Sequence, residues 1–76
     1  GGKVMRIGGR KINMGDCERI TGTRYSELYY SDCGVWILEN KKRLGRGRFR
    51  IISAPEARKI METAGVGRLL GKFFEK

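Results

Sequence analysis

Residues 35–57 read VWILENKKRLGRGRFRIISAPEA, and this stretch decides how the rest of the chain folds. It begins with Val35 to Leu38, the most apolar run of the sequence, which predicts the central strand of a sheet. After a glycine-containing loop, Arg48 to Ile52 alternates between basic and apolar residues as a strand does, with Arg48 and Arg50 on one face. The stretch then reaches Ser53-Ala54-Pro55-Glu56. A serine cap, a proline in the first turn and a glutamate three residues after the serine predict a helix start.

The chain before this stretch is rich in strand-forming residues. Gly8-Gly9 separates two short runs, Val4 to Ile7 and Arg10 to Met14, an arrangement typical of a tight hairpin turn. Isoleucine, threonine and tyrosine follow, and we expect a strand from Arg24 to Tyr30 because these residues suit a pleated surface. Ser31 to Gly34 is dense in turn formers and separates that strand from the central one.

Two helical segments are expected after the stretch. In the first, apolar residues recur on one helical face until Gly65 ends the helix. The second is a short amphipathic run whose apolar side consists of Leu69, Leu70, Phe73 and Phe74. The sequence therefore predicts one α+β domain over residues 1–76, with a strand-rich part (3–52) and a helical part (53–76). We expect a small antiparallel β-sheet of three to five strands followed by one or two C-terminal α-helices, which would leave the second face of the sheet free for a ligand.

The charge of the chain indicates its class of partner. Its 76 residues carry 17 Lys and Arg against eight Asp and Glu, a formal net charge of +9. A field of this sign attracts polyanions such as DNA, RNA or an anionic membrane surface. The basic residues are densest between positions 41 and 50, where no acidic residue occurs. We expect six of them to contact phosphates from a basic hairpin: Lys41, Lys42, Arg43, Arg46, Arg48 and Arg50. The alternative is a solvated hairpin tip that discourages edge pairing.

A second candidate contact lies near the C-terminus. The run from Ile60 to Phe74 places Gly65-Val66-Gly67 between two short helical segments. This pattern resembles the helix-hairpin-helix motif of DNA-binding proteins that do not read sequence, with Gly71 and Phe74 at the family's small and apolar positions. The resemblance implies that Gly65, Gly67 and Arg68 hold the DNA backbone, since amides free of side chains can donate to phosphate oxygens. A helix ended by a glycine and followed by an unrelated helix is the alternative.

The aromatic residues give a third candidate. Tyrosines between arginines on a sheet face stack on unpaired bases in single-strand and RNA binders, and Tyr25 and Tyr29 are the candidates here. Trp36 and Phe49 are expected in the core.

Catalytic and metal chemistry lack their usual residues. The chain has no histidine and two cysteines, Cys17 and Cys33, which we expect to be free or buried thiols, although a disulfide between them stays open. We expect no enzyme, no metal, no cofactor and no small-molecule substrate, because no nucleophile motif is present and the acids are scattered. The absence of glutamine and the scarcity of asparagine resemble the composition of thermophile proteins.

These features predict a small, intracellular, basic DNA-binding protein with a regulatory or architectural role. DNA is favoured over RNA, but an RNA-binding or ribosome-associated module is the first alternative, and the sequence leaves single against double strand open. A module of another class would use the C-terminal amphipathic run to contact a protein or a membrane surface. A chain this short buries little apolar surface, so a homodimer is one way to complete its core.

Overall fold

A pair of glycines makes the first turn of the fold. In a computed structural model of the chain, which describes residues 3–74, Gly8 and Gly9 have φ angles of 57° and 81°. Residues without a Cβ adopt this left-handed backbone freely, and it matches the twist of a two-residue hairpin. The turn joins β1 (Val4–Ile7) to β2 (Arg10–Asn13), which pair antiparallel, so the predicted hairpin is confirmed.

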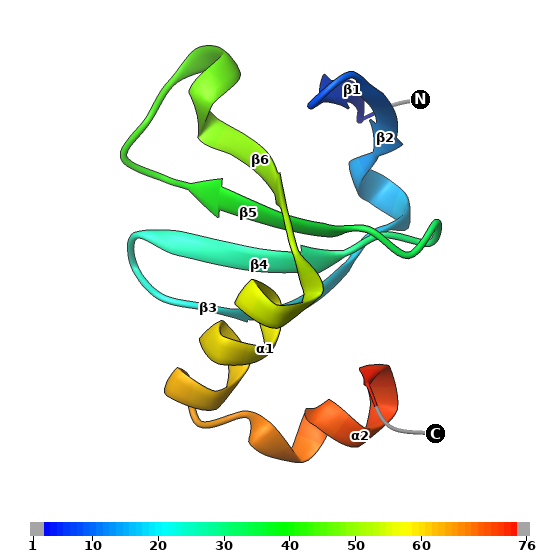
Figure 1. Ribbon diagram of the computed structural model, residues 1–76. Helices are drawn as coiled ribbons and strands as arrows, with labels where there is room; N and C mark the ends of the chain where they lie inside the picture. Colours follow the sequence, from blue (N-terminus) through cyan, green and yellow to red (C-terminus); the bar gives the residue numbers. More distant parts are fainter. Residues whose placement is uncertain (1–2, 75–76) are drawn as a thin grey trace.

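The main sheet has four antiparallel strands in sequence order (Figure 1). After a 3-10 turn, η1 (Met14–Asp16), come β3 (Glu18–Gly22), β4 (Ser26–Tyr30), β5 (Trp36–Asn40) and β6 (Phe49–Ile52). The apolar β5 lies between β4 and β6, as its sequence predicts. The α+β class, with a small antiparallel sheet before the helices, is therefore confirmed.

Two local expectations for these strands were wrong. The strand expected from Arg24 begins at Ser26, because Thr23 makes a turn in which its Oγ1 accepts hydrogen bonds from the amides of Tyr25 (3.1 Å) and Ser26 (3.2 Å). Arg48 does not share a strand face with Arg50, because it ends a 3-10 turn, η2 (Gly45–Arg48), immediately before β6.

The first helix begins and ends with the signals that the sequence carries. Ser53 caps α1 (Ala54–Thr63) by accepting a hydrogen bond from the amide of Glu56 at 3.2 Å. At the other end Gly65 has a φ of 79°, its amide bonds to the Glu62 carbonyl, and the amide of Val66 bonds to the Met61 carbonyl. This is a Schellman motif, and it turns the chain into η3 (Gly67–Leu69) and α2 (Leu70–Phe73).

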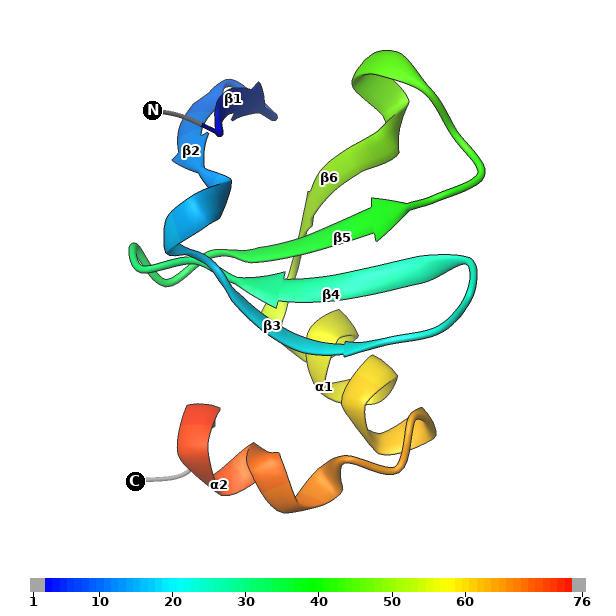
Figure 2. The same cartoon turned by 180° about the vertical axis from the view of Figure 1, so that it is seen from behind.

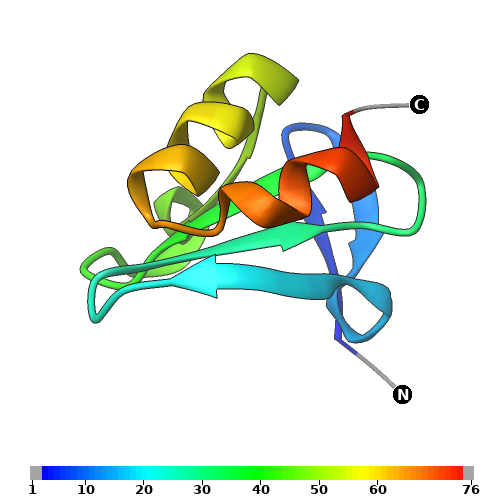
Figure 3. The ribbon, with the colours of Figure 1, turned by 90° about the horizontal axis from the view of Figure 1, so that it is seen from below.

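The sheet is covered on both faces. The helices lie across one face, where Leu28, Trp36, Ile52 and Met61 form a core against which α2 packs (Figures 1 and 3). The β1–β2 hairpin lies on the opposite side of the sheet from the helices (Figure 2). Its Ile7 and Ile12 pack against Ile37. The expectation that the second face of the sheet is free for a ligand was therefore wrong. Apolar residues alternate along β4, β5 and β6 on both sides, so each face needs a covering layer.

The aromatic residues of the C-terminal amphipathic run pack against the sheet of the same chain. Phe73 packs edge-on against Tyr30 and Trp36, with ring centroids 5.0 and 5.2 Å apart, and Phe74 stacks on Trp36 at 5.4 Å. Within residues 3–74, none of the helices combines the length and apolar character needed to cross a bilayer. Cys17 and Cys33 are free thiols, and burial raises the pKa of Cys17 above its ordinary value of 9.0.

Candidate nucleic-acid interface

Three of the six basic residues between positions 41 and 50 are bonded to carboxylates of the fold. The Nζ of Lys41 donates to Glu27 Oε2 and to the carbonyl of Thr23, so this side chain ties β5 to the β3–β4 turn. The Nε of Arg48 donates to Oε2 of Glu39 at 2.7 Å. On the other face of the sheet, Arg50 bonds to a carboxylate of α1, with its Nη2 3.2 Å from Glu56 Oε2. Lys41 and Arg48 are thus matched by nearly buried carboxylates, whereas the Arg50–Glu56 pair lies at the surface, with side-chain exposures of 58% and 42%.

Two of those carboxylates are buried, which explains why they need cations. Glu27 and Glu39 are paired directly across β4 and β5 and have relative exposures of 9% and 6%. Burial alone would raise the pKa of Glu27, but hydrogen bonds from Lys41 and Arg19 outweigh it and lower the pKa below its ordinary 4.5. Like charges placed opposite each other on a sheet repel, so the surrounding cations are part of the structure of this face.

The other three basic residues of the segment point to solvent. Lys42, Arg43 and Arg46 are exposed, and within residues 3–74 the structure gives none of them an ion pair with a carboxylate. They sit on the connection from β5 to β6, which forms the end of the hairpin (Figure 1). These are the members of the predicted contact set whose charge is available to a ligand.

The tip that carries them is held in one conformation by polar bonds. Asn40 accepts hydrogen bonds from the amide of Lys42 at its Oδ1 (3.0 Å) and from the amide of Arg43 at its carbonyl (3.1 Å). Arg48 reaches back so that its Nη1 lies 3.5 Å from the carbonyl of Arg43. Gly45 takes a φ of 68°, which a residue with a Cβ rarely adopts. A tip ordered in this way loses little conformational entropy when it binds.

The β3–β4 turn adds a cation that the charge pattern alone did not reveal. The carbonyl of Tyr25 accepts a hydrogen bond from the amide of Lys41 at 2.7 Å, which places this turn beside the hairpin tip. The Nζ of Lys42 lies 4.3 Å from the centre of the Tyr25 ring, and the guanidinium of Arg24 lies 5.8 Å from it. We call Arg24, Lys42, Arg43 and Arg46 together the basic end. Arg24 has no basic neighbour in the sequence. The pairing of β4 with β5 brings it beside the hairpin tip.

A groove extends the basic end toward the β1–β2 turn. Arg6, Gly8, Gly9, Arg46 and Phe49 line it, so two arginines from opposite ends of the strand-rich part stand around one cavity of about 390 Å³. The Nη1 of Arg6 donates to the carbonyl of Gly9 at 3.2 Å, which holds that side chain at the edge of the groove. Arg6 is a second cation that sequence reasoning missed.

Of the four aromatic residues considered from the sequence, Tyr25 is exposed and the other three are buried or half-buried. Trp36 is 5% exposed and Phe49 packs in the second core, as expected. Tyr29 is half-buried and its hydroxyl donates to Glu39 Oε1 at 3.1 Å; burial, with that hydrogen bond, raises its pKa to about 12. Tyr25 is 49% exposed, in the turn. One of the two stacking candidates is thus accessible to a base.

Comparison with known proteins adds nothing to these observations. No family model, curated protein or solved structure matches this chain. Among the described residues, no three His, Cys, Asp or Glu side chains are grouped as a metal site would require. What the basic end binds therefore has to be inferred from its own residues.

The glycines of the C-terminal motif lie where the chain passes from one helix to the next. Gly65 ends α1 and Gly67 begins η3, while Arg68 is exposed. The second helix consists of one 3-10 turn and one α-helical turn, so it is shorter than α1. The helix-hairpin-helix resemblance, and with it the phosphate contact by Gly65, Gly67 and Arg68, stays a prediction.

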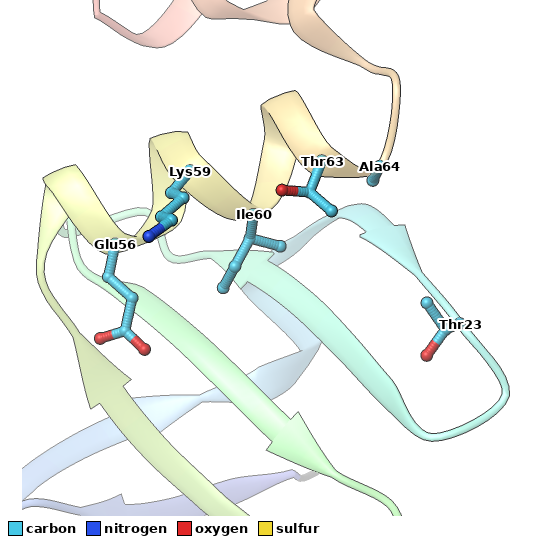
Figure 4. A pocket seen from close by; sticks show the side chains of 6 residues that line it. All are labelled: Thr23, Glu56, Lys59, Ile60, Thr63 and Ala64. Atoms are coloured by element: carbon cyan, nitrogen blue, oxygen red, sulfur yellow. The ribbon is translucent and has the colours of Figure 1, made fainter.

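A further groove shows where this motif lies relative to the basic end. It has a volume of about 550 Å³ and separates α1 from the β3–β4 turn, with Thr23 on one side and Ile60, Thr63 and Ala64 on the other (Figure 4). Its two charged side chains are Lys59 and Glu56, and Glu56 already bonds Arg50. The C-terminal end of α1, and the glycines after it, are therefore at the same end of the sheet as the turn that carries Arg24.

Proposed function

We propose that this chain binds double-stranded DNA by contacting its phosphates with the basic end. The observation that carries the proposal is the division of the basic residues: Lys41, Arg48 and Arg50 are matched to carboxylates, while Lys42, Arg43 and Arg46 are exposed on an ordered tip. Arginine forms bidentate bonds with phosphate, and the proposed contact set contains three arginines and one lysine. The net charge of +9 supplies the long-range attraction.

The burial of the aromatic residues favours a duplex over a single strand. Proteins that hold single strands stack successive bases on exposed aromatic rings. Here both faces of the sheet are covered, and Trp36, Tyr29 and Phe49 lie wholly or partly inside. In the described part of the chain, Tyr25 is the one accessible ring at the basic end. Backbone contacts to a duplex need no row of such rings.

A second contact is proposed at Gly65, Gly67 and Arg68. It is supported by the resemblance to the helix-hairpin-helix motif and by the groove that places the end of α1 across from Thr23. The end of α1 and the β3–β4 turn are far apart in the sequence. Both lie at the same end of the sheet as the hairpin tip. Two separate grips on one DNA backbone would fix the orientation of the protein on the duplex.

The test is a salt-dependent binding series on duplex DNA, single-stranded DNA and RNA of the same sequence. If the four cations of the basic end each neutralise one phosphate, log K should fall with log salt with a slope of about −3.6 from these contacts. Substituting Lys42, Arg43 and Arg46 by Ala should flatten the slope by about 2.7. The three side chains are exposed, so the variant should keep its fold.

A matched control removes three charges elsewhere. Arg10, Arg58 and Lys72 are exposed; Arg10 and Arg58 line cavities that also involve Ala54 and Phe74, and Lys72 pairs with Glu18 at the start of β3. Their replacement by Ala should change the slope by less than one unit. Equal slopes for the two triple variants would contradict a contact at the basic end. Tighter binding of RNA than of duplex DNA would favour the RNA-binding alternative instead.

A further inference from the structure

One large apolar side chain stands in the middle of the basic end. Leu44 has a relative exposure of 86%, against 48% for Val4 and 49% for Tyr25, the other two large hydrophobic residues that are exposed in the described part of the chain. It lies between Arg43 and Gly45, and no part of residues 3–74 covers it. A lone exposed leucine is ordinary on a surface, but this one is placed between cations proposed to hold phosphates.

The exposure of Leu44 follows from an ordered backbone. Leu44 is the residue before η2, with φ of −116° and ψ of 160°, and its neighbours on both sides are fixed. On one side Arg43 is bonded through its amide to Asn40 and through its carbonyl to Arg48. On the other, Gly45 adopts the left-handed turn that starts η2. The fold therefore presents this side chain outward at the end of the hairpin.

The cations around Leu44 would set its position on a duplex. Lys42 and Arg43 precede it and Arg46 follows it, so phosphates held on either side would press the leucine into the groove between them. Proteins that bend DNA insert apolar wedges, leucine among them, between base steps from the minor groove. The unstacking costs a few kcal/mol and is repaid by contacts that the bent duplex allows.

We propose that Leu44 is such a wedge, which inserts between two adjacent base pairs from the minor groove and bends the duplex. The inference rests on the proposed function, because it needs the neighbouring cations to hold DNA. Tyr25, beside Lys42, is the second apolar surface that the bent duplex would meet. A lipid surface is the competing partner for an exposed leucine among cations. It is disfavoured because membrane-binding elements bury a whole apolar helical face, whereas a wedge needs one side chain.

The test measures bending and unstacking separately from affinity. A duplex of about 20 base pairs carries a fluorophore pair at its ends to report bending by energy transfer. A second duplex carries 2-aminopurine, whose fluorescence rises when its base unstacks. The full chain should shorten the end-to-end distance and raise the 2-aminopurine signal. Leu44→Ala should lose most of both signals while its affinity falls only about threefold to tenfold, and Leu44→Met should retain them.

Val4→Ala is the matched control, since it shortens an exposed aliphatic side chain on β1. It should bend DNA as the unmodified chain does. If Leu44→Ala also bends and unstacks the duplex fully, the wedge is wrong. If the unmodified chain binds duplex DNA with the predicted salt slope but neither bends nor unstacks it, the wedge fails and the proposed function stands.

Two further outcomes distinguish a failure of the proposed DNA binding from a failure of the wedge alone. Absence of salt-dependent binding to any duplex would overturn the proposed function and the wedge together. Binding to vesicles that contain phosphatidylserine is measured in parallel. A Leu44→Ala variant that loses vesicle binding but keeps DNA bending would assign the leucine to a membrane surface and overturn the wedge.

Discussion

Glu27 and Glu39 lie directly opposite each other on β4 and β5, both nearly buried, on the face of the sheet that the β1–β2 hairpin covers. Each carboxylate is bonded to a basic residue of the segment 41–50: Lys41 in one case and Arg48 in the other. The densest run of positive charge in the sequence thus serves two purposes. Part of it neutralises an internal pair of like charges, and the remainder is exposed.

This division predicts that Arg48 contributes to stability and that Arg46, two residues before it, does not. Arg48→Ala should lower the free energy of unfolding by about 1–3 kcal/mol, because it leaves Glu39 buried with Tyr29 as its remaining hydrogen-bond partner. Arg46→Ala should change stability by less than about 0.5 kcal/mol, since that side chain is exposed. Urea unfolding of the two variants measures the difference. Equal stabilities would show that the Arg48 bond contributes nothing to the fold.

The same carboxylates predict how stability depends on pH. The pKa of Glu27 is lowered in the folded protein, so its contribution is fully present above the ordinary value of 4.5 and is lost as the pH falls through the folded-state pKa. The free energy of unfolding should therefore decrease in that acidic range. Glu27→Gln should make the decrease shallower, as measured by urea unfolding between about pH 6 and pH 3. A variant with the same pH profile as the unmodified chain would contradict this role.

The fold was largely predictable where a local signal decides it. Gly8-Gly9 marks the first hairpin, Ser53 and Pro55 mark the helix start, and Gly65 marks its end, because each sets backbone geometry within a few residues. The covered second face was missed for a different reason. A hairpin that packs on a sheet is joined to it by contacts between residues distant in sequence, and the alternation of apolar residues on both faces of β4 to β6 was the signal available.

The candidate site was predictable as a charge density but not as a set of contacts. Lys41 and Arg43 are both basic residues in one loop, and the sequence offers nothing that separates the bonded from the exposed one. The strand register decides which residue is bonded, because it pairs Glu27 with Glu39 and so places carboxylates within reach of Lys41 and not of Arg43. Arg24 and Arg6 join the surface for the same reason, since pairing of strands and packing of the hairpin bring them beside the tip.

A glycine next to Glu27 gives a third prediction. Gly22 is paired with Glu27 across β3 and β4, and a Cβ at this position would overlap the glutamate's carboxylate. Gly22→Ala should therefore displace Glu27 from its cations and lower the free energy of unfolding by about 1–3 kcal/mol. Thermal unfolding followed by circular dichroism provides the measurement. If Gly22→Ala lowers the free energy of unfolding as much in a Glu27→Ala background as in the unmodified chain, the overlap is not the cause.

The last prediction concerns the second proposed contact with DNA. A Cβ at Gly67 would meet no atom of residues 3–74 within 4 Å, and the φ of this glycine is not left-handed, so Gly67→Ala should leave stability within about 0.5 kcal/mol of the unmodified chain. If the amides at the start of η3 donate to a phosphate, the added methyl group should hinder that approach and lower duplex affinity severalfold. Fluorescence anisotropy with labelled duplex measures the affinity. Val4→Ala, an exposed change on β1, is the control and should bind as the unmodified chain does. Unchanged affinity for Gly67→Ala would leave the basic end as the sole grip and would remove the helix-hairpin-helix resemblance from the mechanism, because a folded variant blocked at that amide would still hold DNA.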